Sequence, residues 1–323
     1  MTESGTPRLL LGADIGGTAT RVAVSTVAGE VLGVAAGPAG NPNSVGLEVS
    51  AERIRTVAEQ CLTQCGLHAA DRVLAAVIGL AGGGRADESF LTAVRPPRLA
   101  VRPRLVSDLA VAFSSATPSP QGYVLVAGTG AVAGRIVAGE LRERRDGWGW
   151  LLGDEGSGFW LGREAVRATL TRLQAGTEPV GPLAEAVLRL TGTRDPVAIV
   201  QQCYANPPVW LSTFAELVAR HADDPVAAAI AARAAEHLVD TLLDLDLDPD
   251  LPVVLAGSVA TRPGPVREAL RARLDERLIN PVLTAESGLV GALWLAAGTL
   301  DRPDEAVHTR LARSLSRTSG TVV

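Results

Sequence analysis

The chain repeats one local pattern, in which an apolar strand enters a glycine-rich turn and a second strand leaves it. The two copies have the same order of elements, so that Arg135 in the second copy corresponds to Arg21 in the first. This repeat predicts a duplicated α/β domain, and 323 residues exceed the length over which one core usually keeps growing. We therefore expect two domains, with a ligand site in the cleft between them. The strand, turn and strand are Leu9–Leu11, Gly16-Gly17-Thr18 and Arg21–Ser25 in the first copy, and Tyr123–Ala127, Gly128-Thr129-Gly130 and Gly134–Val137 in the second.

Helical and strand patterns alternate along the rest of the chain. Val49–Cys65 has the apolar spacing of a helix, and Val73–Leu80 and Arg104–Ser107 are typical of buried strands. Near the end, Ala285–Ala297 predicts a last long helix. This alternation indicates an α/β fold. The expected units are residues 1–115 for the first domain, 116–285 for the second and 314–323 for a flexible tail.

The composition restricts how the chain could bind a nucleotide. It contains no lysine, so all 30 basic residues are arginine. This excludes a phosphate-binding loop that ends in Gly-Lys-Ser/Thr, the strand lysine of protein kinases and a Schiff-base lysine. If the protein binds ATP, backbone N–H groups and a metal ion must hold the phosphates. The net charge of −5, without a basic block, argues against nucleic acid or an anionic membrane as a partner.

The cysteines and the absence of long apolar runs indicate the cellular compartment. Cys61, Cys65 and Cys203 are too few and too irregularly spaced for a disulfide framework or a four-ligand zinc site. The start, Met1–Arg8, is polar, and no apolar stretch reaches the roughly 18 residues of a membrane span. We therefore expect a reduced, cytoplasmic protein.

The two glycine turns are candidate phosphate-binding sites. Glycine lets backbone N–H groups approach a polyphosphate, and the hydroxyls of Thr18 and Thr129 add donors. Either turn alone could instead serve a tight hairpin, but their recurrence favours phosphate binding. The second turn also fits the dinucleotide fingerprint, as Gly128-x-Gly130-x-x-Ala133. That fingerprint opens a helix, whereas Gly134 and Gly139 interrupt the segment after this turn, which argues against the nicotinamide interpretation.

Two aspartates follow strands and have two interpretations each. Asp14 could hold a water of a phosphate-bound Mg²⁺, or it could simply initiate a turn. Asp108 could be a catalytic base, or it could be the N-cap of the helix that begins near Leu109. Taken alone, its position after a strand favours the cap.

The stretch from Asp146 to Trp160 has the composition of a binding loop. It contains five glycines, three of the five tryptophans and the adjacent carboxylates of Asp154 and Glu155. Aromatic faces suit a pyranose ring and a carboxylate suits its hydroxyls, although the tryptophans could instead form an aromatic minicore. We predict a sugar-binding loop.

Taken together, these motifs resemble the N-acetylglucosamine kinase branch of the BadF/BadG/BcrA/BcrD ATPase family, in the actin/hexokinase superfamily. The resemblance extends from about Leu9 to Ala297. It implies two actin-like (ribonuclease H-like) α/β domains with an interdomain cleft, and a last helix, about 286–300, that packs back on the first domain. It further implies ATP and Mg²⁺ as cofactors and phosphorylation of an amino sugar at the 6-hydroxyl. We also expect a homodimer.

The resemblance assigns roles to individual residues. The implied catalytic base is Asp108, and the implied metal-binding residue is Asp14. The implied nucleotide-binding residues are Gly16, Gly17, Thr18, Gly128, Thr129, Gly130, Gly257 and Ser258. The implied sugar-binding residues are Asn41, Asp108, Gly147, Trp148, Asp154 and Gly158.

Three residues depart from the family pattern. Ala81 stands where relatives often have serine, and Ala131 and Val132 stand where a polar residue or two is usual. These departures remove possible contacts to sugar and phosphate.

Alternatives stay open for the substrate and for the class of protein. Trp148 and Asn41 favour N-acetylglucosamine, but Glu48 or Glu155 could bind the amine of glucosamine. An activating ATPase of a dehydratase or reductase would need cysteines around an iron–sulfur cluster, and no ligand set presents itself. A sugar-sensing regulator has no support, because no helix-turn-helix precedes the first strand.

Overall fold

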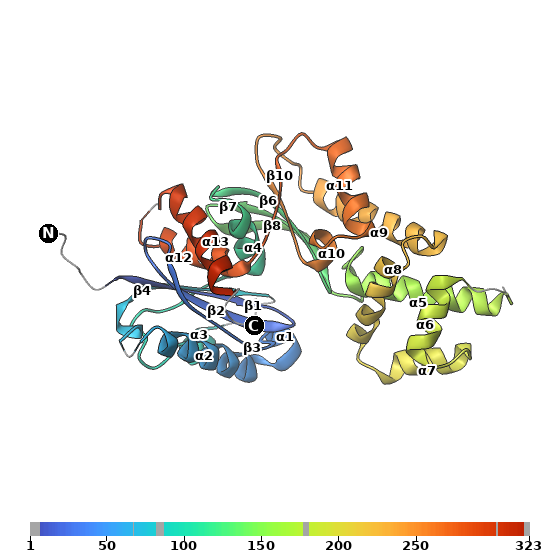
Figure 1. Ribbon diagram of the computed structural model, residues 1–323, viewed down its shortest axis with the longest axis horizontal. Helices are drawn as coiled ribbons and strands as arrows, with labels where there is room; N and C mark the ends of the chain where they lie inside the picture. The colour runs from blue at the N-terminus through green and yellow to red at the C-terminus, as the bar shows by residue number, and fades with distance from the viewer. Residues whose placement is uncertain (1–6, 67, 82–86, 177–180, 302, 320–323) are drawn as a thin grey trace. The chain divides into compact units, whose positions relative to one another are not determined.

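The computed structural model describes residues 7–66, 68–81, 87–176, 181–301 and 303–319 (Figure 1). Its contacts divide the chain into two compact units. Unit 1 consists of Met1–Gly122, Ile136–Leu141 and Ala285–Val323, and unit 2 consists of Tyr123–Arg135 and Arg142–Thr284. That these units fold as independent domains with a boundary near residue 115 stays a prediction.

Unit 1 is built on a five-stranded mixed sheet in the described part of the chain, with the order β3-β2-β1-β4-β5. β1 pairs antiparallel with β2 and parallel with β4, and β4 pairs parallel with β5. Apolar residues of β1 are buried on both faces, as expected of a strand covered by helices on two sides. The strands are β1 (Leu9–Ile15), β2 (Ala19–Thr26), β3 (Val31–Pro38), β4 (Val73–Leu80) and β5 (Arg104–Ser107).

Helices cover both faces of this sheet. In Figure 1, α2 and α3 lie on one side, whereas α4 and α12 lie on the other, and α12 contacts β1 and β4. The helix predicted near the end of the chain therefore packs on the first strand. The helices of unit 1 are α1 (Pro42–Val45), α2 (Leu47–Gln64), α3 (Glu88–Val94), α4 (Asp108–Ala116), α12 (Gly288–Gly298) and α13 (Glu305–Ser319), with a 3₁₀ turn η1 (Ala70–Arg72).

Two glycines let α12 approach its neighbours closely. A Cβ on Gly12 of β1 would come within 2.8 Å of the backbone nitrogen of Leu293. A Cβ on Gly291 would come within 2.0 Å of the carbonyl oxygen of Val111 in α4. Leu289 to Ala297 are all buried, which matches a helix that is apolar on every side.

Unit 2 repeats the same plan with the sheet order β10-β9-β6-β7-β8 in its described residues. β9 pairs parallel with both β6 and β10. The strands are β6 (Gln121–Ala127), β7 (Ala131–Val137), β8 (Glu140–Asp146), β9 (Val253–Ala256) and β10 (Val282–Thr284). The helices are α5 (Gly158–Gln174), α6 (Pro182–Thr191), α7 (Pro196–Ala205), η3 (Pro208–Phe214), α8 (Ala215–Arg220), α9 (Pro225–Leu243), α10 (Ser258–Thr261) and α11 (Pro265–Arg277).

The core of unit 2 is mostly alanine, valine and leucine, as the shortage of aromatic residues predicts. α9 presents Ala227, Ala231 and Ala234 to it, so the helix can lie close to its neighbours. Trp160 of α5 and Tyr123 of β6 are the largest fully buried side chains in this core. The Tyr123 hydroxyl donates to the Asp246 carbonyl and accepts from the Asp248 N–H, which satisfies its buried polar end.

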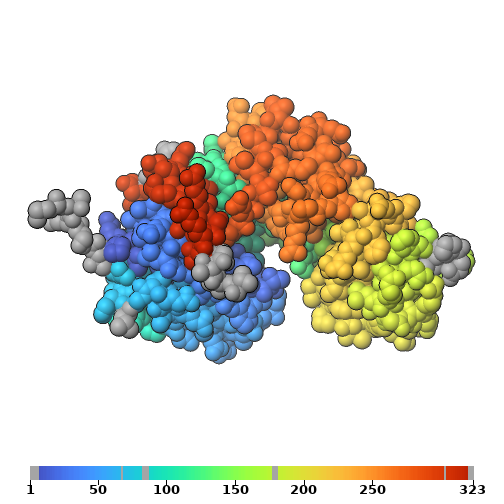
Figure 2. Space-filling view, viewed as in Figure 1, coloured from blue at the N-terminus to red at the C-terminus, as the bar shows by residue number. Residues whose placement is uncertain are grey.

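The prediction of a flexible tail from residue 314 is wrong as far as residue 319, and residues 320–323 lie outside the described part. α13 continues to Ser319 because it has a buried apolar stripe, Val307, Leu311 and Leu315, at helical spacing. It packs on β3 and α12, and Val31 donates to the Ser314 hydroxyl at 2.9 Å. In Figure 2 this helix, in red, lies over the blue N-terminal part of unit 1. None of the helices in the described ranges is long and apolar enough to cross a membrane.

The packing of α13 predicts a stability effect. Leu311 is fully buried, so Leu311→Ala should lower the free energy of unfolding by about 2 to 5 kcal/mol. Arg313 is exposed on the same helix, and Arg313→Ala should change it by less than about 0.5 kcal/mol. Denaturant unfolding measures the free energy of unfolding of the two variants. Equal stability of the two variants would show that this segment does not pack in solution.

Candidate functional site

The predicted site residues of unit 1 gather at one edge of its sheet. Because β1, β3, β4 and β5 run in the same direction, their carboxyl ends meet there. The first glycine turn, 16–18, follows β1, Asn41 follows β3, and Asp108 follows β5. β1 and β5 are separated by β4, so Asp14 and Asp108 are on the order of 10 Å apart across the sheet. In open α/β sheets, ligands bind at the carboxyl ends of the strands.

The first turn does not need glycine for its own conformation. Gly16 and Gly17 do not have positive φ. A Cβ on Gly17 would meet no atom within 4 Å, and Gly17 and Thr18 are at least partly open to solvent. The hairpin explanation of these glycines therefore fails. An open, side-chain-free turn fits the close approach of a ligand.

Asp14 is held in a site that disfavours its charge. Burial raises the pKa of its carboxyl group, while the Arg21 guanidinium opposes this shift. A Cβ on Gly288, the first residue of α12, would come within 2.5 Å of the Asp14 carboxyl group. Gly288 thus makes room for a carboxylate at the start of this helix, where the helix dipole favours a negative charge.

Asp108 is the first residue of α4 and not its N-cap. The N-cap is Ser107, whose hydroxyl accepts from the Leu109 N–H at 3.0 Å. The capping interpretation of Asp108 is therefore wrong. Asn41, by contrast, is the N-cap of α1, where its side-chain oxygen accepts from the Asn43 N–H at 2.9 Å. Its amide nitrogen is the group that could donate to a ligand.

The second turn, 128–130, is tied to the start of α5. Gly158 donates to the Gly128 carbonyl at 2.7 Å, and Phe159 donates to the Thr129 carbonyl at 3.1 Å. Gly128 does not have positive φ, and a Cβ on it would meet no atom within 4 Å, so packing does not explain this glycine either. The turn leads into β7 and not into a helix, which confirms that the dinucleotide fingerprint does not apply.

Three loops of unit 2 meet at one edge of its sheet. Since β6, β7 and β8 are neighbours joined by short turns, β6 and β8 end at the same edge, and β9 runs parallel to β6. The second turn, the loop 147–153 and Gly257 follow the ends of these strands. Gly257 has φ +83°, and a Cβ there would come within 2.4 Å of the Ala127 carbonyl oxygen. This glycine is required by both conformation and packing.

The tryptophan-rich loop presents apolar groups to solvent. Trp148 is 67% exposed, and Leu151 and Leu152 are 73% and 74% exposed. Trp150 contacts Phe159, with ring centroids 5.6 Å apart, and Trp160 is buried. The minicore alternative therefore holds for Trp160 but not for Trp148, which is available to pack on a ligand.

Asp154 links this loop to the second turn. A Cβ on Gly130 would come within 2.8 Å of its carboxylate, so Gly130 is needed for this contact. Burial raises the pKa of the Asp154 carboxyl group and repulsion by Asp146 adds to this, while the Ala131 and Gly149 N–H groups lower it through hydrogen bonds. Ala131 therefore contributes its backbone, although its side chain departs from the family pattern. Gly158 is buried at the start of α5 with its N–H already bonded to Gly128.

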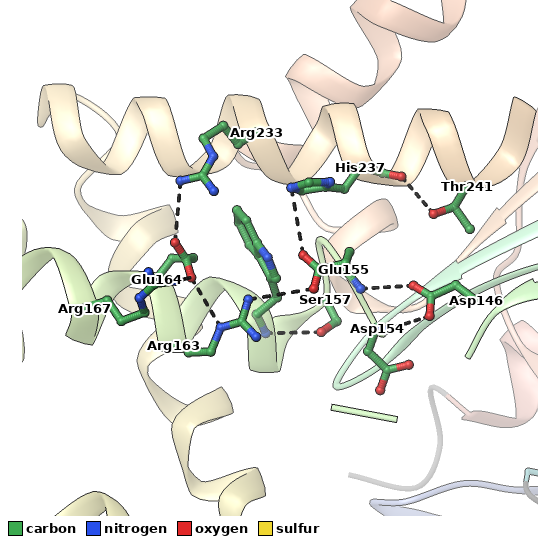
Figure 3. Close-up of polar contacts among 11 residues, drawn as sticks. Asp146, Asp154, Glu155, Ser157, Arg163, Glu164, Arg167, Arg233, His237 and Thr241 are labelled. Carbon is green, nitrogen blue, oxygen red and sulfur yellow. Dashed lines mark hydrogen bonds and ion pairs between the residues drawn. The ribbon is translucent and has the colours of Figure 1, made fainter. Parts of the chain in front are cut away.

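Sequence reasoning missed a set of ion pairs that joins α5, α9 and Glu155 (Figure 3). The Glu164 carboxylate is buried and pairs with Arg167 at 2.9 Å, Arg163 at 3.3 Å and Arg233 at 3.5 Å. Glu155 pairs with Arg163 at 3.8 Å and approaches His237 at 3.9 Å. These partners come from α5 and α9, so only the tertiary structure reveals them. The sequence signal was limited to the adjacent Asp154 and Glu155.

A cavity of about 540 Å³ adjoins Ser258 in unit 2. α8, α10 and α11 form its walls, with Val259 and Arg262 beside Ser258. Its volume falls in the range of small-molecule sites. Ser258 is one of the two residues expected to bind the adenosine part of a nucleotide.

The two α/β units each carry their candidate binding loops at the carboxyl ends of the strands. They define an actin-like fold of the sugar kinase type. The chain belongs to the BadF/BadG/BcrA/BcrD ATPase family, whose profile matches residues 11–296.

Two named relatives align with different fractions of the chain. An N-acetyl-D-glucosamine kinase of Dictyostelium discoideum is 25% identical over 299 residues, or 84% of this chain and 92% of the relative. An N-acetylmuramic acid/N-acetylglucosamine kinase of Clostridium acetobutylicum is 29% identical over 167 residues, or 50% of this chain. This second match spans about half of the Clostridium protein, 54% of its length.

A solved structure shares the whole fold. It is a proposed N-acetylglucosamine kinase of Chromobacterium violaceum, which is 29% identical, with a TM-score of 0.74. The match covers 90% of this chain and all of the other, so both α/β units are shared.

The raised pKa of Asp14 predicts a gain in stability when its charge is removed. Ionisation in the buried site is unfavourable, so stability is lost as the pH rises from the unfolded pKa of about 4 through the higher folded pKa. Asp14→Asn should therefore raise Tm at pH 7, and the gain should shrink as the pH approaches about 4. Thermal unfolding across this pH range measures it. An Asn variant that is less stable than the wild type at pH 7 would contradict the assignment.

Proposed function

We propose that the protein is an ATP-dependent kinase that transfers the γ-phosphate to the 6-hydroxyl of an amino sugar, N-acetylglucosamine. The observation that carries this proposal is the pair of glycine turns, 16–18 and 128–130. Neither backbone conformation nor side-chain packing requires glycine at positions 17 and 128. Family membership and the relatives of known name support it.

Asp108 is proposed as the general base. Its carboxylate would accept the proton of the 6-hydroxyl as that oxygen attacks the γ-phosphate in line. Phosphoryl transfer depends on positioning and electrostatics more than on covalent chemistry, so backbone N–H groups of the two turns can serve in place of a lysine.

The residues of unit 1 fit a magnesium ion bound to nucleotide phosphates. Mg²⁺ usually keeps several waters and needs only one or two protein carboxylates besides the phosphates. No group of three or more His, Cys, Asp or Glu side chains that could hold a metal occurs in the described ranges. The single carboxylate of Asp14, in a site where burial raises its pKa, would gain from a nearby cation. The ion would neutralise charge on the phosphates.

The surroundings of Glu155 favour the acetylated sugar over glucosamine. Glu155 is paired with Arg163 and lies 3.9 Å from His237, so its charge is compensated within unit 2. Glu48 is exposed in the first turn of α2. Trp148 offers an exposed apolar face for an acetyl group, and Asn41 keeps an amide donor.

The cysteines do not support the activating-ATPase alternative. Cys61 is buried in the core of unit 1, and Cys203 lies in α7 of unit 2. The hydrogen bond between the Cys61 and Cys65 thiols raises the pKa of Cys61 and lowers the pKa of Cys65, so the two thiols are paired with each other within unit 1. We further propose that the protein is a cytoplasmic homodimer, as its composition and family suggest.

Replacement of the base tests the mechanism. Asp108→Asn should lower kcat by about 10²- to 10⁴-fold, because a general base contributes that much, while circular dichroism and Tm stay close to wild type. Steady-state assays of ADP release measure the effect. A variant with near-normal turnover would disprove the role of Asp108.

A substrate panel tests the acceptor. ADP release, coupled to NADH oxidation, should give the highest kcat/KM with N-acetylglucosamine, and lower values with N-acetylmannosamine, glucosamine and glucose. Highest kcat/KM with glucosamine would correct the substrate and keep the kinase. Release of ADP without any sugar, together with bound iron in the purified protein, would instead establish the activating ATPase.

A further inference from the structure

The tryptophan-rich loop is closed at its base by one carboxylate. Asp146, the last residue of β8, accepts from the Asp154 N–H at 2.8 Å with Oδ1 and from the Glu155 N–H at 3.0 Å with Oδ2 (Figure 3). Both oxygens are therefore used to join the start of the loop to its end. Hydrogen bonds to an ionised acceptor are stronger than neutral ones.

The backbone around this carboxylate is shaped to fit it. Asp146 and Asp154 both have positive φ, +57° and +58°, a left-handed conformation that few residues other than glycine, asparagine and aspartate adopt. A Cβ on Gly153 would come within 2.0 Å of Asp146 Oδ1, although Gly153 itself does not have positive φ. Glycine is thus needed at position 153 to admit the carboxylate, and not for its own conformation.

The loop would be costly to order without such a closure. Gly147 and Gly149 have φ of +71° and +85°, values that few other residues adopt. Glycine is also the most flexible residue in the unfolded chain, so fixing these two positions costs conformational entropy. Trp148, Leu151 and Leu152 are exposed and contribute little packing to hold the loop. The backbone bonds within the loop are local, from the Leu152 and Gly153 N–H groups to the Gly149 carbonyl.

We propose that Asp146 is a positioning residue that preorganises the sugar-binding loop. It holds the Asp154 N–H, and the Asp154 carboxylate in turn lies against Gly130 of the second turn. The hydrogen bonds thus fix where Trp148 and Asp154 stand before the sugar arrives, which lowers the entropy loss on binding. This inference rests on the proposed function for the identity of the ligand, but the closure itself can be tested without one.

The first test is the kinetic effect of removing the carboxylate. Asp146→Ala should raise KM for N-acetylglucosamine by about tenfold or more and change KM for ATP less, because the loop must be ordered at each binding event. Asp146→Asn keeps one acceptor oxygen and should fall between Ala and wild type. An unchanged KM for the sugar in both variants would overturn the proposal.

Asp224 is a matched control in the same unit. It also accepts two backbone N–H groups, from Leu183 at 2.9 Å and Val226 at 2.7 Å, but it joins α6 to α9. Asp224→Asn should lower Tm without changing KM for the sugar. An equal rise of KM in Asp224→Asn and Asp146→Asn would show a general loss of stability and overturn the positioning role.

The second test is a double-mutant cycle with Gly153. In the wild type, Gly153→Ala places a methyl group on the carboxylate of Asp146 and should raise KM for the sugar as Asp146→Ala does. In the Asp146→Ala background that collision is gone, so Gly153→Ala should add little. Strong non-additivity supports the closure, and additive effects would overturn it.

The third test needs no substrate. In the free protein, Asp146→Ala should speed hydrogen exchange of the amides of residues 147–155 at least about tenfold, whereas Asp224→Asn should not. Unchanged exchange would overturn the closure. If exchange rises but no amino sugar is phosphorylated by the wild type, the proposed function fails and the closure stands.

Discussion

Close approaches at glycine positions hold the loops of unit 2 in one cluster. Gly257 touches the Ala127 carbonyl, Gly158 donates to the Gly128 carbonyl, and Gly130 touches the carboxylate of Asp154. A side chain at position 257 would collide with the backbone of Ala127, and one at position 130 would displace the Asp154 carboxylate. The candidate phosphate turn and sugar loop therefore depend on these close approaches.

In unit 1, glycines allow close packing of a helix. Gly12 and Gly291 let α12 lie directly on β1 and α4, and Gly288 makes room for the Asp14 carboxyl group at the start of that helix. The helix that closes the core thus also shapes the site of the proposed metal-binding residue. Burial of Asp14 is a consequence of this packing, and its raised pKa follows from the burial.

Much of the fold could be predicted because its signals are local. The strands around both glycine turns and the buried helix at 288–298 follow from apolar runs of the appropriate length. The tail was mispredicted because Val307, Leu311 and Leu315 become an apolar stripe only when β3 and α12 are present to cover them. The capping role of Ser107 was missed for a related reason, since Ser107 and Asp108 are both good N-caps and the backbone decides between them.

The sequence by itself determined the repeated strand, turn and strand, and its lack of lysine excluded any lysine-based phosphate site. It also predicted a binding role for the tryptophan-rich segment, and that role stays a prediction. Only the tertiary structure decided which glycines serve packing and which leave a turn open, that Trp160 is core while Trp148 is exposed, and that Asp146 closes the loop. Composition and periodicity predict local structure, because they depend only on residues that are near each other in the sequence. Close approach between segments depends on sheet register and helix packing, which bring together residues that no local pattern connects.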